Sequence, residues 1–144
     1  MADAWVPARA AIGVEQAHGS DGVRAFYTAI GTRFHPNDEP KGDLEVVRAA
    51  LADCGFDEGI ADRATTTEWD DALRASHEAG MRPVGNDVGT PVIHINGKAL
   101  FGPVISPAPK GEAAGELFDG LEKVTAYDGF FELKRSRDVG PIFD

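Results

Sequence analysis

The sequence predicts an α/β protein in which a helical region over residues 1–84 precedes a ββα region over residues 85–144. Apolar residues recur at helical spacing through the first two thirds of the chain. The pattern then changes, because Val92–Ile95 is a short run of mainly β-branched residues and is followed directly by Asn96-Gly97. Asn-Gly is the strongest two-residue signal for a β-hairpin, since both residues tolerate positive φ angles. A helical block followed by a hairpin is therefore expected.

Five helical segments are expected in the first region, each with its apolar residues on one face. They are Pro7–His18, a segment from Ser20 or Asp21 to Phe34, a segment from Asp43 to Gly55, Asp57–Ala64, and a segment that carries Trp69, Ala72, Leu73 and Ser76. Gly80 is expected to end the last of these. Thr65 and Glu68 have the spacing of a capping box, which predicts the start of that helix.

The second region continues with a return strand and a final helix. Lys98–Phe101 is expected to pair with the first strand and to end at Gly102-Pro103. The final helix is marked by apolar residues at helical spacing, namely Ala114, Leu117, Phe118, Leu121 and Val124. The aromatic tail Phe130–Leu133 is expected to pack back on the domain. An isolated hairpin is marginally stable, and Val92–Ile95 is apolar on both faces, so the sheet is expected to lack a neighbouring strand.

Charge and hydropathy exclude several classes of partner. Fourteen Lys and Arg residues against 24 Asp and Glu residues give a net charge of −10, which repels nucleic acid and anionic lipid. No run of about eighteen apolar residues is present, so no membrane span is expected. The N-terminus has no basic region followed by an apolar block, and a cytoplasmic location is therefore expected.

The chain contains one cysteine, Cys54, and this limits its redox chemistry. A single thiol cannot form a Cys-x-x-Cys pair or a cysteine-rich zinc site. Cys54 lies on an apolar stripe near the end of a predicted helix and beside Asp53, where a thiolate is disfavoured. The four histidines show no metal-ligand spacing, so no metal site and no bound cofactor are expected.

Five phrases, spread in order over nearly the whole chain, resemble a known family. They are GVEQAHG (Gly13–Gly19), SHEAGM (Ser76–Met81), VGTP (Val88–Pro91), INGKALFGPV (Ile95–Val104) and FFELKR (Phe130–Arg135). The chain resembles the DsbA-like thioredoxin-fold oxidoreductases, and within them the mycothiol-dependent nitroreductases and related reductases. The resemblance implies a thioredoxin-like fold of DsbA type, with a helical insertion over residues 1–84 and the C-terminal ββα half over residues 85–144.

The resemblance also implies a site. In the family a proline after Thr or Val is cis and its loop lies against the redox cysteines, which assigns substrate binding to Gly89, Thr90 and Pro91. The N-terminal βαβ half of the family, which carries the Cys-x-x-Cys, has no counterpart in this sequence. No catalytic residue is therefore assigned, and the chain is expected to be a truncated form that is inactive alone.

Three functions follow as hypotheses. The first is a thiol-disulfide oxidoreductase that uses mycothiol or a similar low-molecular-weight thiol, with a small thiol or disulfide as substrate. The second is an enzyme like 2-hydroxychromene-2-carboxylate isomerase or a kappa-class glutathione transferase, which share the fold and can use a serine in place of the cysteine. The third is a non-catalytic binding module that forms a homodimer through its exposed sheet edge.

Overall fold

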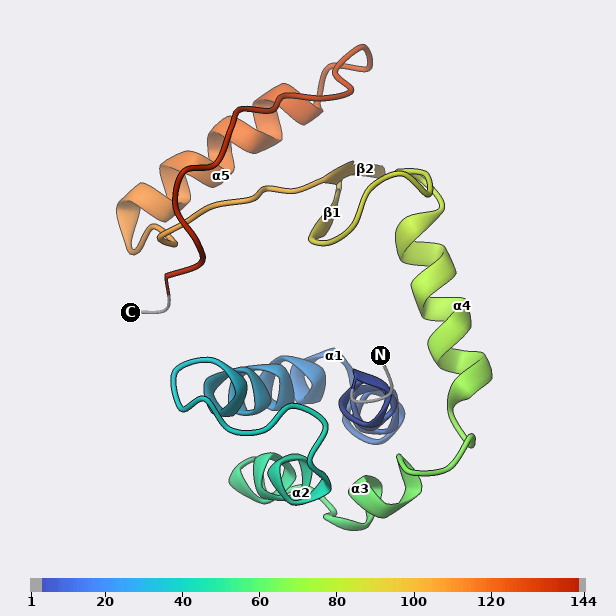
Figure 1. Ribbon diagram of the computed structural model, residues 1–144. Coiled ribbons are helices and arrows are strands. Elements are labelled where there is room, and N and C mark those ends of the chain that lie inside the picture. The colour runs from blue at the N-terminus through green and yellow to red at the C-terminus, as the bar shows by residue number, and fades with distance from the viewer. Residues whose placement is uncertain (1–3, 143–144) are drawn as a thin grey trace. The chain divides into compact units, whose positions relative to one another are not determined.

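The computed structural model describes residues 4–142, which form two compact units. The helical unit ends at Ser76 and contains α1 (Trp5–Phe34), α2 (Leu44–Asp53), α3 (Gly59–Arg63) and the start of α4 (Asp70–Met81). The hairpin unit begins at His77 and contains the rest of α4, then β1 (Val92–Ile95), β2 (Lys98–Phe101) and α5 (Glu112–Thr125) (Figure 1). The two units meet inside α4, whereas the domain boundary expected from the sequence lies between residues 84 and 85.

Helix α1 contains both helices that the sequence predicts at the N-terminus. It is interrupted at Gly19, whose φ of 67° and ψ of −165° are not helical. A positive φ is favourable for glycine because it has no Cβ, so the chain changes direction there at little cost. The two parts of α1 can therefore present different faces to the same core.

The hydrophobic core of the described chain lies in the helical unit. Every buried hydrophobic residue among residues 4–142 falls between Ala10 and Trp69. Helices α1, α2 and α3 contact one another in pairs, and Figure 1 shows them packed together. The core residues are Ala10, Ile12, Val14, Phe26, Ile30, Val46, Val47, Ala50, Leu51, Ile60, Ala61, Ala64 and Trp69. Burial of these side chains is the main source of stability for this unit.

Helix α2 begins and ends as its sequence predicts, but the start of α4 does not. Asp43 caps α2 by accepting a hydrogen bond from the Glu45 backbone N–H at 2.9 Å. The predicted capping box of Thr65 and Glu68 is wrong. Thr65 Oγ1 donates to the Asp62 carbonyl at 2.7 Å, and the Glu68 carboxylate binds Arg63 at 2.6 Å. A guanidinium is a stronger partner for a carboxylate than a backbone N–H is, so the ion pair forms instead.

The predicted hairpin forms at the predicted residues. Strands β1 and β2 are antiparallel, with Val92 opposite Phe101 and Ile95 opposite Lys98. The turn residues Asn96 and Gly97 have φ angles of 50° and 81°, the combination that two-residue hairpin turns require. Among residues 4–142 the sheet has two strands only, so both of its edges lack a third strand.

The C-terminal tail does not pack as expected. The side chains of Phe131 and Leu133 are 82% and 87% exposed, so the prediction that Phe130–Leu133 packs back is wrong for these two residues, whereas Phe130 is half-buried. The tail is held further along by polar contacts, because Ser106 Oγ donates to the Gly140 carbonyl at 2.7 Å and accepts from the Ile142 N–H at 3.0 Å. These two hydrogen bonds between the Ser106 side chain and the tail backbone fix the path of the tail without burying Phe131 or Leu133.

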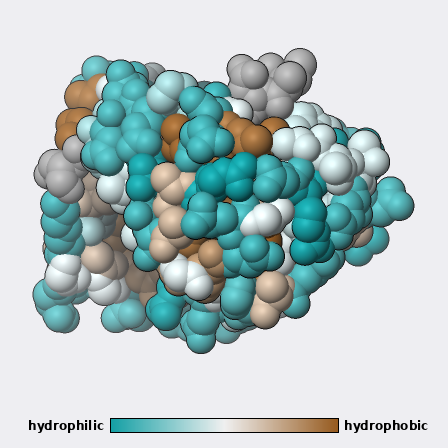
Figure 2. Space-filling view, turned by 90° about the horizontal axis from the view of Figure 1, so that it is seen from below, coloured by the Kyte–Doolittle hydropathy of each residue, from teal (hydrophilic) through white to brown (hydrophobic). Residues whose placement is uncertain are grey.

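The surface of the chain is mainly polar, in keeping with its net charge of −10. The face drawn in Figure 2 is largely hydrophilic, with separate hydrophobic patches between the polar side chains. Among residues 4–142, no helix is both long and apolar enough to cross a membrane.

The ion pair between Arg9 and Asp70 joins the two ends of the helical unit and gives a testable prediction. Arg9 Nε donates to Asp70 Oδ1 at 2.6 Å, and both side chains are largely buried. This hydrogen bond lowers the pKa of Asp70 below its ordinary value of 3.8. A depressed aspartate pKa adds stability at neutral pH, which is lost as the pH falls through the folded-state pKa. We expect Asp70→Asn to lower the midpoint of thermal unfolding at pH 7 and to flatten its decline in acid.

The matched control is Asp71→Asn. Asp71 is the adjacent residue, its side chain is fully exposed, and its contact with Arg74 is long at 3.9 Å. Exposed ion pairs contribute little, so thermal unfolding of this variant between pH 2 and pH 7 should follow the unmodified chain. Equal losses of stability in the two variants would contradict the role assigned to Asp70.

Candidate functional site

The Gly89–Pro91 loop lies in the hairpin unit and leads directly into β1. Gly89, Thr90 and Pro91 are all exposed, whereas Val88 before them is half-buried. The Thr90–Pro91 peptide bond is cis in the structure. The Pro91 carbonyl accepts a hydrogen bond from the Gly102 N–H at 2.8 Å, so the ladder between the strands extends one residue beyond β1. The loop is thus attached to the sheet at Pro91 and open to solvent before it.

The Thr90 backbone makes no hydrogen bond in the part of the chain that the structure describes. Within residues 4–142, neither its N–H nor its carbonyl has a hydrogen-bond partner. An exposed N–H and carbonyl at the end of a strand can pair with an extended group in the way that an added strand does. The loop can therefore receive a peptide-like ligand through one donor and one acceptor.

Polar contacts fix the hairpin that carries this loop. At the turn, Asn96 Nδ2 donates to Glu122 Oε1 at 3.0 Å, and Lys98 Nζ donates to the Ala126 carbonyl at 2.8 Å. Lys98 also pairs with Asp128 at 2.6 Å, and this hydrogen bond lowers the pKa of Asp128. These contacts attach the turn to the C-terminal end of α5.

His94 attaches the middle of β1 to α4. Its Nε2 lies 2.9 Å from the Gly80 carbonyl, near the C-terminal end of that helix. Gly80 was expected to end the helix, but α4 continues to Met81. Because the contact is made by an exposed side chain, it positions β1 without adding buried apolar area.

Cys54 belongs to the helical unit and lacks the surroundings of a reactive thiol. It is half-buried at the C-terminal cap of α2, where its backbone N–H bonds to the Leu51 carbonyl. Burial raises the pKa of the Cys54 thiol, and the adjacent Asp53 carboxylate raises it further. A thiol with a raised pKa is a poor nucleophile at neutral pH, so Cys54 is not a redox centre of the usual kind. Among the residues that the structure describes, no cluster of three His, Cys, Asp or Glu side chains could hold a metal ion.

A cavity in the helical unit was not predicted from the sequence. It is a hollow of about 260 Å³ that is open to solvent, lined by Gly13, Gln16, Ala17, His18, Asp57, Ile60 and Arg63, of which only Gly13 and Ile60 are buried. The first four of these residues belong to the phrase GVEQAHG, which is the signal that could have indicated it. The remaining three come from α3 and the residues just before it, and the contact between α1 and α3 brings the two groups together.

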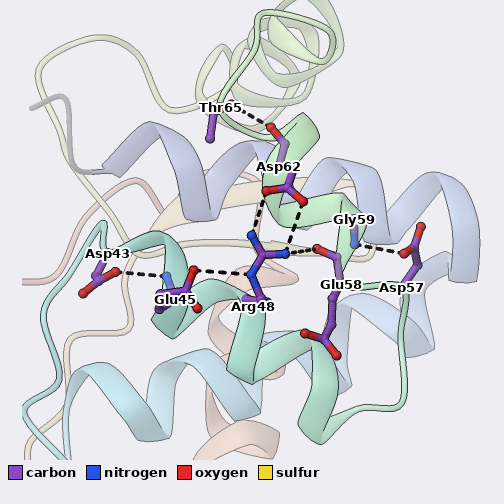
Figure 3. Close-up of polar contacts among 8 residues, drawn as sticks. All are labelled: Asp43, Glu45, Arg48, Asp57, Glu58, Gly59, Asp62 and Thr65. Carbon is purple, nitrogen blue, oxygen red and sulfur yellow. Dashed lines mark hydrogen bonds and ion pairs between the residues drawn. The ribbon is translucent and has the colours of Figure 1, made fainter.

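The α3 side of this cavity is fixed by the Arg48 cluster shown in Figure 3. Arg48 extends from α2 and binds Asp62 through two hydrogen bonds of 2.7 and 3.2 Å. It also donates to the Glu58 carbonyl at 3.3 Å. These contacts lower the pKa of Asp62 and hold α3 against α2. In the same view the Asp57 carboxylate accepts a hydrogen bond from the Gly59 N–H at 2.9 Å.

Comparison with known proteins relates both regions to one family. The family model described as Rv2466c-like, mycothiol-dependent nitroreductase Rv2466c, matches residues 1–135. A relative from Mycobacterium tuberculosis (strain ATCC 25618 / H37Rv), named uncharacterized protein Rv2286c, is 32% identical over 119 residues. The matched region is 81% of this chain and 50% of that protein, so the chain spans about half the length of this relative. Since the family match extends over both units, the chain belongs to the Rv2466c-like family.

Proposed function

We propose that this chain is part of a mycothiol-linked thiol-disulfide oxidoreductase of DsbA type, in which Gly89, Thr90 and Pro91 bind the thiol or disulfide substrate. The observation that carries the proposal is the exposed Thr90 backbone, whose N–H and carbonyl lack partners within residues 4–142. A thiol built on cysteine has amide groups beside its sulfur, and these can pair with that donor and acceptor. The membership in a mycothiol-dependent family supports a thiol of this kind as co-substrate.

The proposed chemistry is thiol-disulfide exchange. A cysteine thiolate attacks one sulfur of a disulfide, a mixed disulfide forms, and the other sulfur leaves as a thiolate that takes up a proton. The thiolate of a second cysteine then attacks the sulfur of the first, so that the two cysteines form a disulfide and the remaining half of the substrate leaves as a thiolate that takes up a proton. Cys54 is the only cysteine in the sequence, and its pKa is raised, so it does not fit the attacking role. We assign the dithiol to a segment outside these 144 residues.

The exposed apolar side chains of the hairpin unit support the proposal that a further segment packs against this unit. Within residues 4–142, the large hydrophobic residues that are strongly exposed lie in this unit apart from Tyr27, and they include Phe101, Leu117 and Phe118. These three side chains are 43–49% exposed, and it is their concentration in one unit, more than any single exposure, that is informative. A βαβ segment of the DsbA type would cover them and pair with β1. The relative Rv2286c has about twice the length of the matched region, which leaves room for such a segment there.

A binding experiment tests the role of the loop directly. The ¹⁵N-labelled chain is titrated with oxidised mycothiol, and backbone amide shifts are followed by NMR. We expect saturable shifts at Gly89, Thr90 and Val92, with little change at Asn96 and Gly97 in the turn at the other end of the hairpin. Shifts confined to other residues, or no shift at millimolar concentration, would rule out this loop as the binding site.

An activity measurement tests the assignment of the dithiol. In an insulin-reduction assay the chain should give no turnover above background, because one thiol cannot cycle between a dithiol and a disulfide. Cys54→Ala should give the same result. Robust turnover by the unmodified chain, lost in Cys54→Ala, would overturn the assignment. Reading the coding DNA upstream of Met1 is the complementary test, because a Cys-x-x-Cys supports the oxidoreductase and a lone serine supports the isomerase or kappa-class type.

A non-catalytic binding module is the second candidate function. Both edges of the two-stranded sheet lack a third strand within residues 4–142, and such edges tend to pair with another chain. Self-association through β1 would give a homodimer whose mass increases with concentration in light scattering. A stable monomer at high concentration would exclude this function while leaving the oxidoreductase proposal intact.

A further inference from the structure

The outer edge of β2, the side that faces away from β1, presents backbone groups that are open to a further strand. In an antiparallel pair, successive residues direct their N–H and C=O groups alternately toward the partner strand and away from it. The Gly102 N–H donates to the Pro91 carbonyl, so Gly102 faces β1, and by the alternation Leu100 does too. Ala99 and Phe101 therefore face outward. Within residues 4–142, the backbone of these two residues has no partner on that side.

The side chains along this edge do not protect it from pairing. Natural edge strands are commonly blocked by an exposed charge or by a proline. Lys98 is the one charged residue of β2, and its Nζ is bound to the Ala126 carbonyl at 2.8 Å and to Asp128 at 2.6 Å. At the other end of the strand, the apolar ring of Phe101 is exposed. The edge thus combines open backbone groups with an exposed aromatic side chain.

The outer edge of β1 is less suited to the same pairing. By the same alternation its outward residues are Val92 and His94. Val92 is half-buried, and His94 Nε2 lies 2.9 Å from the Gly80 carbonyl, which holds the end of α4 beside the strand. The βαβ segment proposed above would also need this edge. The edge of β2 is therefore the one left for a partner.

We propose that β2 pairs with β2 of a second copy of this chain, antiparallel and about a two-fold axis at Leu100. Ala99 then lies opposite Phe101 of the second copy, and each of these two pairs exchanges two N–H···O bonds. A shift of two residues would set Ala99 opposite Pro103, which has no N–H, or Phe101 opposite Gly97 in the turn. A shift of one residue would set outward groups against inward ones. The alternation and the symmetry therefore select a single register.

The side chains fit this register. Ala99 and Phe101 project from the same face of the sheet, because side chains alternate along a strand. Each Phe101 ring lies beside the small Ala99 of the second copy, and the two rings are diagonal neighbours within reach of each other. On the opposite face the two Leu100 side chains meet at the axis. Pairing at the edge is lateral, so it leaves the faces of the sheet, both β1 edges and both Gly89–Pro91 loops accessible.

The interface is small, and the dimer is expected to be weak. A strand of four residues on each side buries far less than the total of about 1,200 Å² at which stable interfaces begin. Each copy also has a net charge of −10, so the two copies repel each other. Salt screens this repulsion, whereas it has little effect on hydrogen bonds and apolar contacts. We therefore expect an association that strengthens as salt is added.

The test follows the full ¹⁵N-labelled chain by NMR and light scattering up to a concentration of about 1 mM. With increasing concentration the mass should rise toward that of a dimer, and the amide shifts of Ala99 and Phe101 should change more than those of Val92 and His94. Both effects should increase with salt. A monomer at the highest concentration would overturn the proposal. So would changes centred on Val92 and His94, or an association that salt weakens, which would indicate ion pairs made by the basic residues 134–137.

A matched pair of proline variants separates the two edges. Ala99→Pro removes an N–H that faces outward, so the ladder between β1 and β2 is retained while the dimer should be lost. His94→Pro makes the same change at the outer edge of β1 and should leave the association unchanged. Contacts across the ladder between Ile93 and Leu100, followed by nuclear Overhauser effects, check that the hairpin still forms. Dimerisation of Ala99→Pro with an intact hairpin would refute the proposal.

A second variant keeps the test decisive if proline disturbs the hairpin. Phe101→Lys retains every backbone N–H and places two like charges at diagonal positions of the paired edges, so the Kd of the dimer should rise by at least about tenfold. The control is Val104→Lys, which adds the same charge at an exposed position beyond the end of β2. Equal effects of the two lysines would show that net charge, and not the edge, governs the association.

Discussion

Replacing Phe26 with alanine is expected to destabilise the helical unit by about 3–5 kcal/mol, the usual range for loss of a buried aromatic side chain. Phe26 is 1% exposed and is among the largest fully buried side chains of the described chain. It lies in the second part of α1, in the core formed with α2 and α3. The loss combines the hydrophobic transfer free energy with the cavity left behind, and urea unfolding monitored by circular dichroism measures it.

Tyr27→Ala is the matched control for this substitution. Tyr27 is the next residue on the same helix, and its side chain is 76% exposed. A change at so exposed a position should alter the free energy of unfolding by less than about 0.5 kcal/mol. Similar losses at the two positions would mean that the core does not lie where the structure places it.

Hydrogen exchange is expected to differ by about a thousandfold between the two units. The comparison uses amides that are hydrogen-bonded within helices in both cases, those of Val47 and Leu51 in α2 and those of Leu117 and Phe118 in α5. Val47 and Leu51 are fully buried, whereas Leu117 and Phe118 are about half exposed. Local opening requires little free energy where few apolar contacts are lost, so the α5 amides should exchange through local opening and the α2 amides through global unfolding.

Native-state exchange followed by NMR measures this difference. A thousandfold ratio corresponds to about 4 kcal/mol, which is within the stability of a small domain. Equal protection of α2 and α5 would contradict the prediction, because it would mean that the hairpin unit is as stable as the helical unit. Exchange that slows in α5 when a βαβ segment is supplied would support the proposed origin of the dithiol.

The expected effect of Phe26→Ala and the expected difference in hydrogen exchange concern function as well as stability. The Gly89–Pro91 loop is carried by a hairpin that polar contacts from Asn96, Lys98 and His94 hold in place. The hollow lined by Gln16 and Arg63 is instead part of the unit that contains the core.

Local patterns in the sequence predicted most of the secondary structure. Asn96-Gly97 indicated both the hairpin and its register, because two-residue turns with positive φ angles leave one way for the strands to pair. The prediction of a capping box failed because Glu68 has a competing partner in Arg63, which lies five residues earlier and on the preceding helix. The prediction that the tail packs back failed because no apolar surface among the described residues covers Phe131 and Leu133.

The sequence by itself determined the order of the elements, the hairpin and the Gly89–Pro91 loop, since each depends on residues that are close along the chain. Only the tertiary structure decided which apolar faces are buried: those of α1, α2 and α3 are, and that of α5 is not. The tertiary structure also determined where the hollow lies. Its lining residues Gln16 and Arg63 are distant in sequence and are brought together by the contact of α1 with α3. Periodicity indicates that a helix has an apolar face, but not which other face will cover it, because that depends on contacts between residues far apart in the chain.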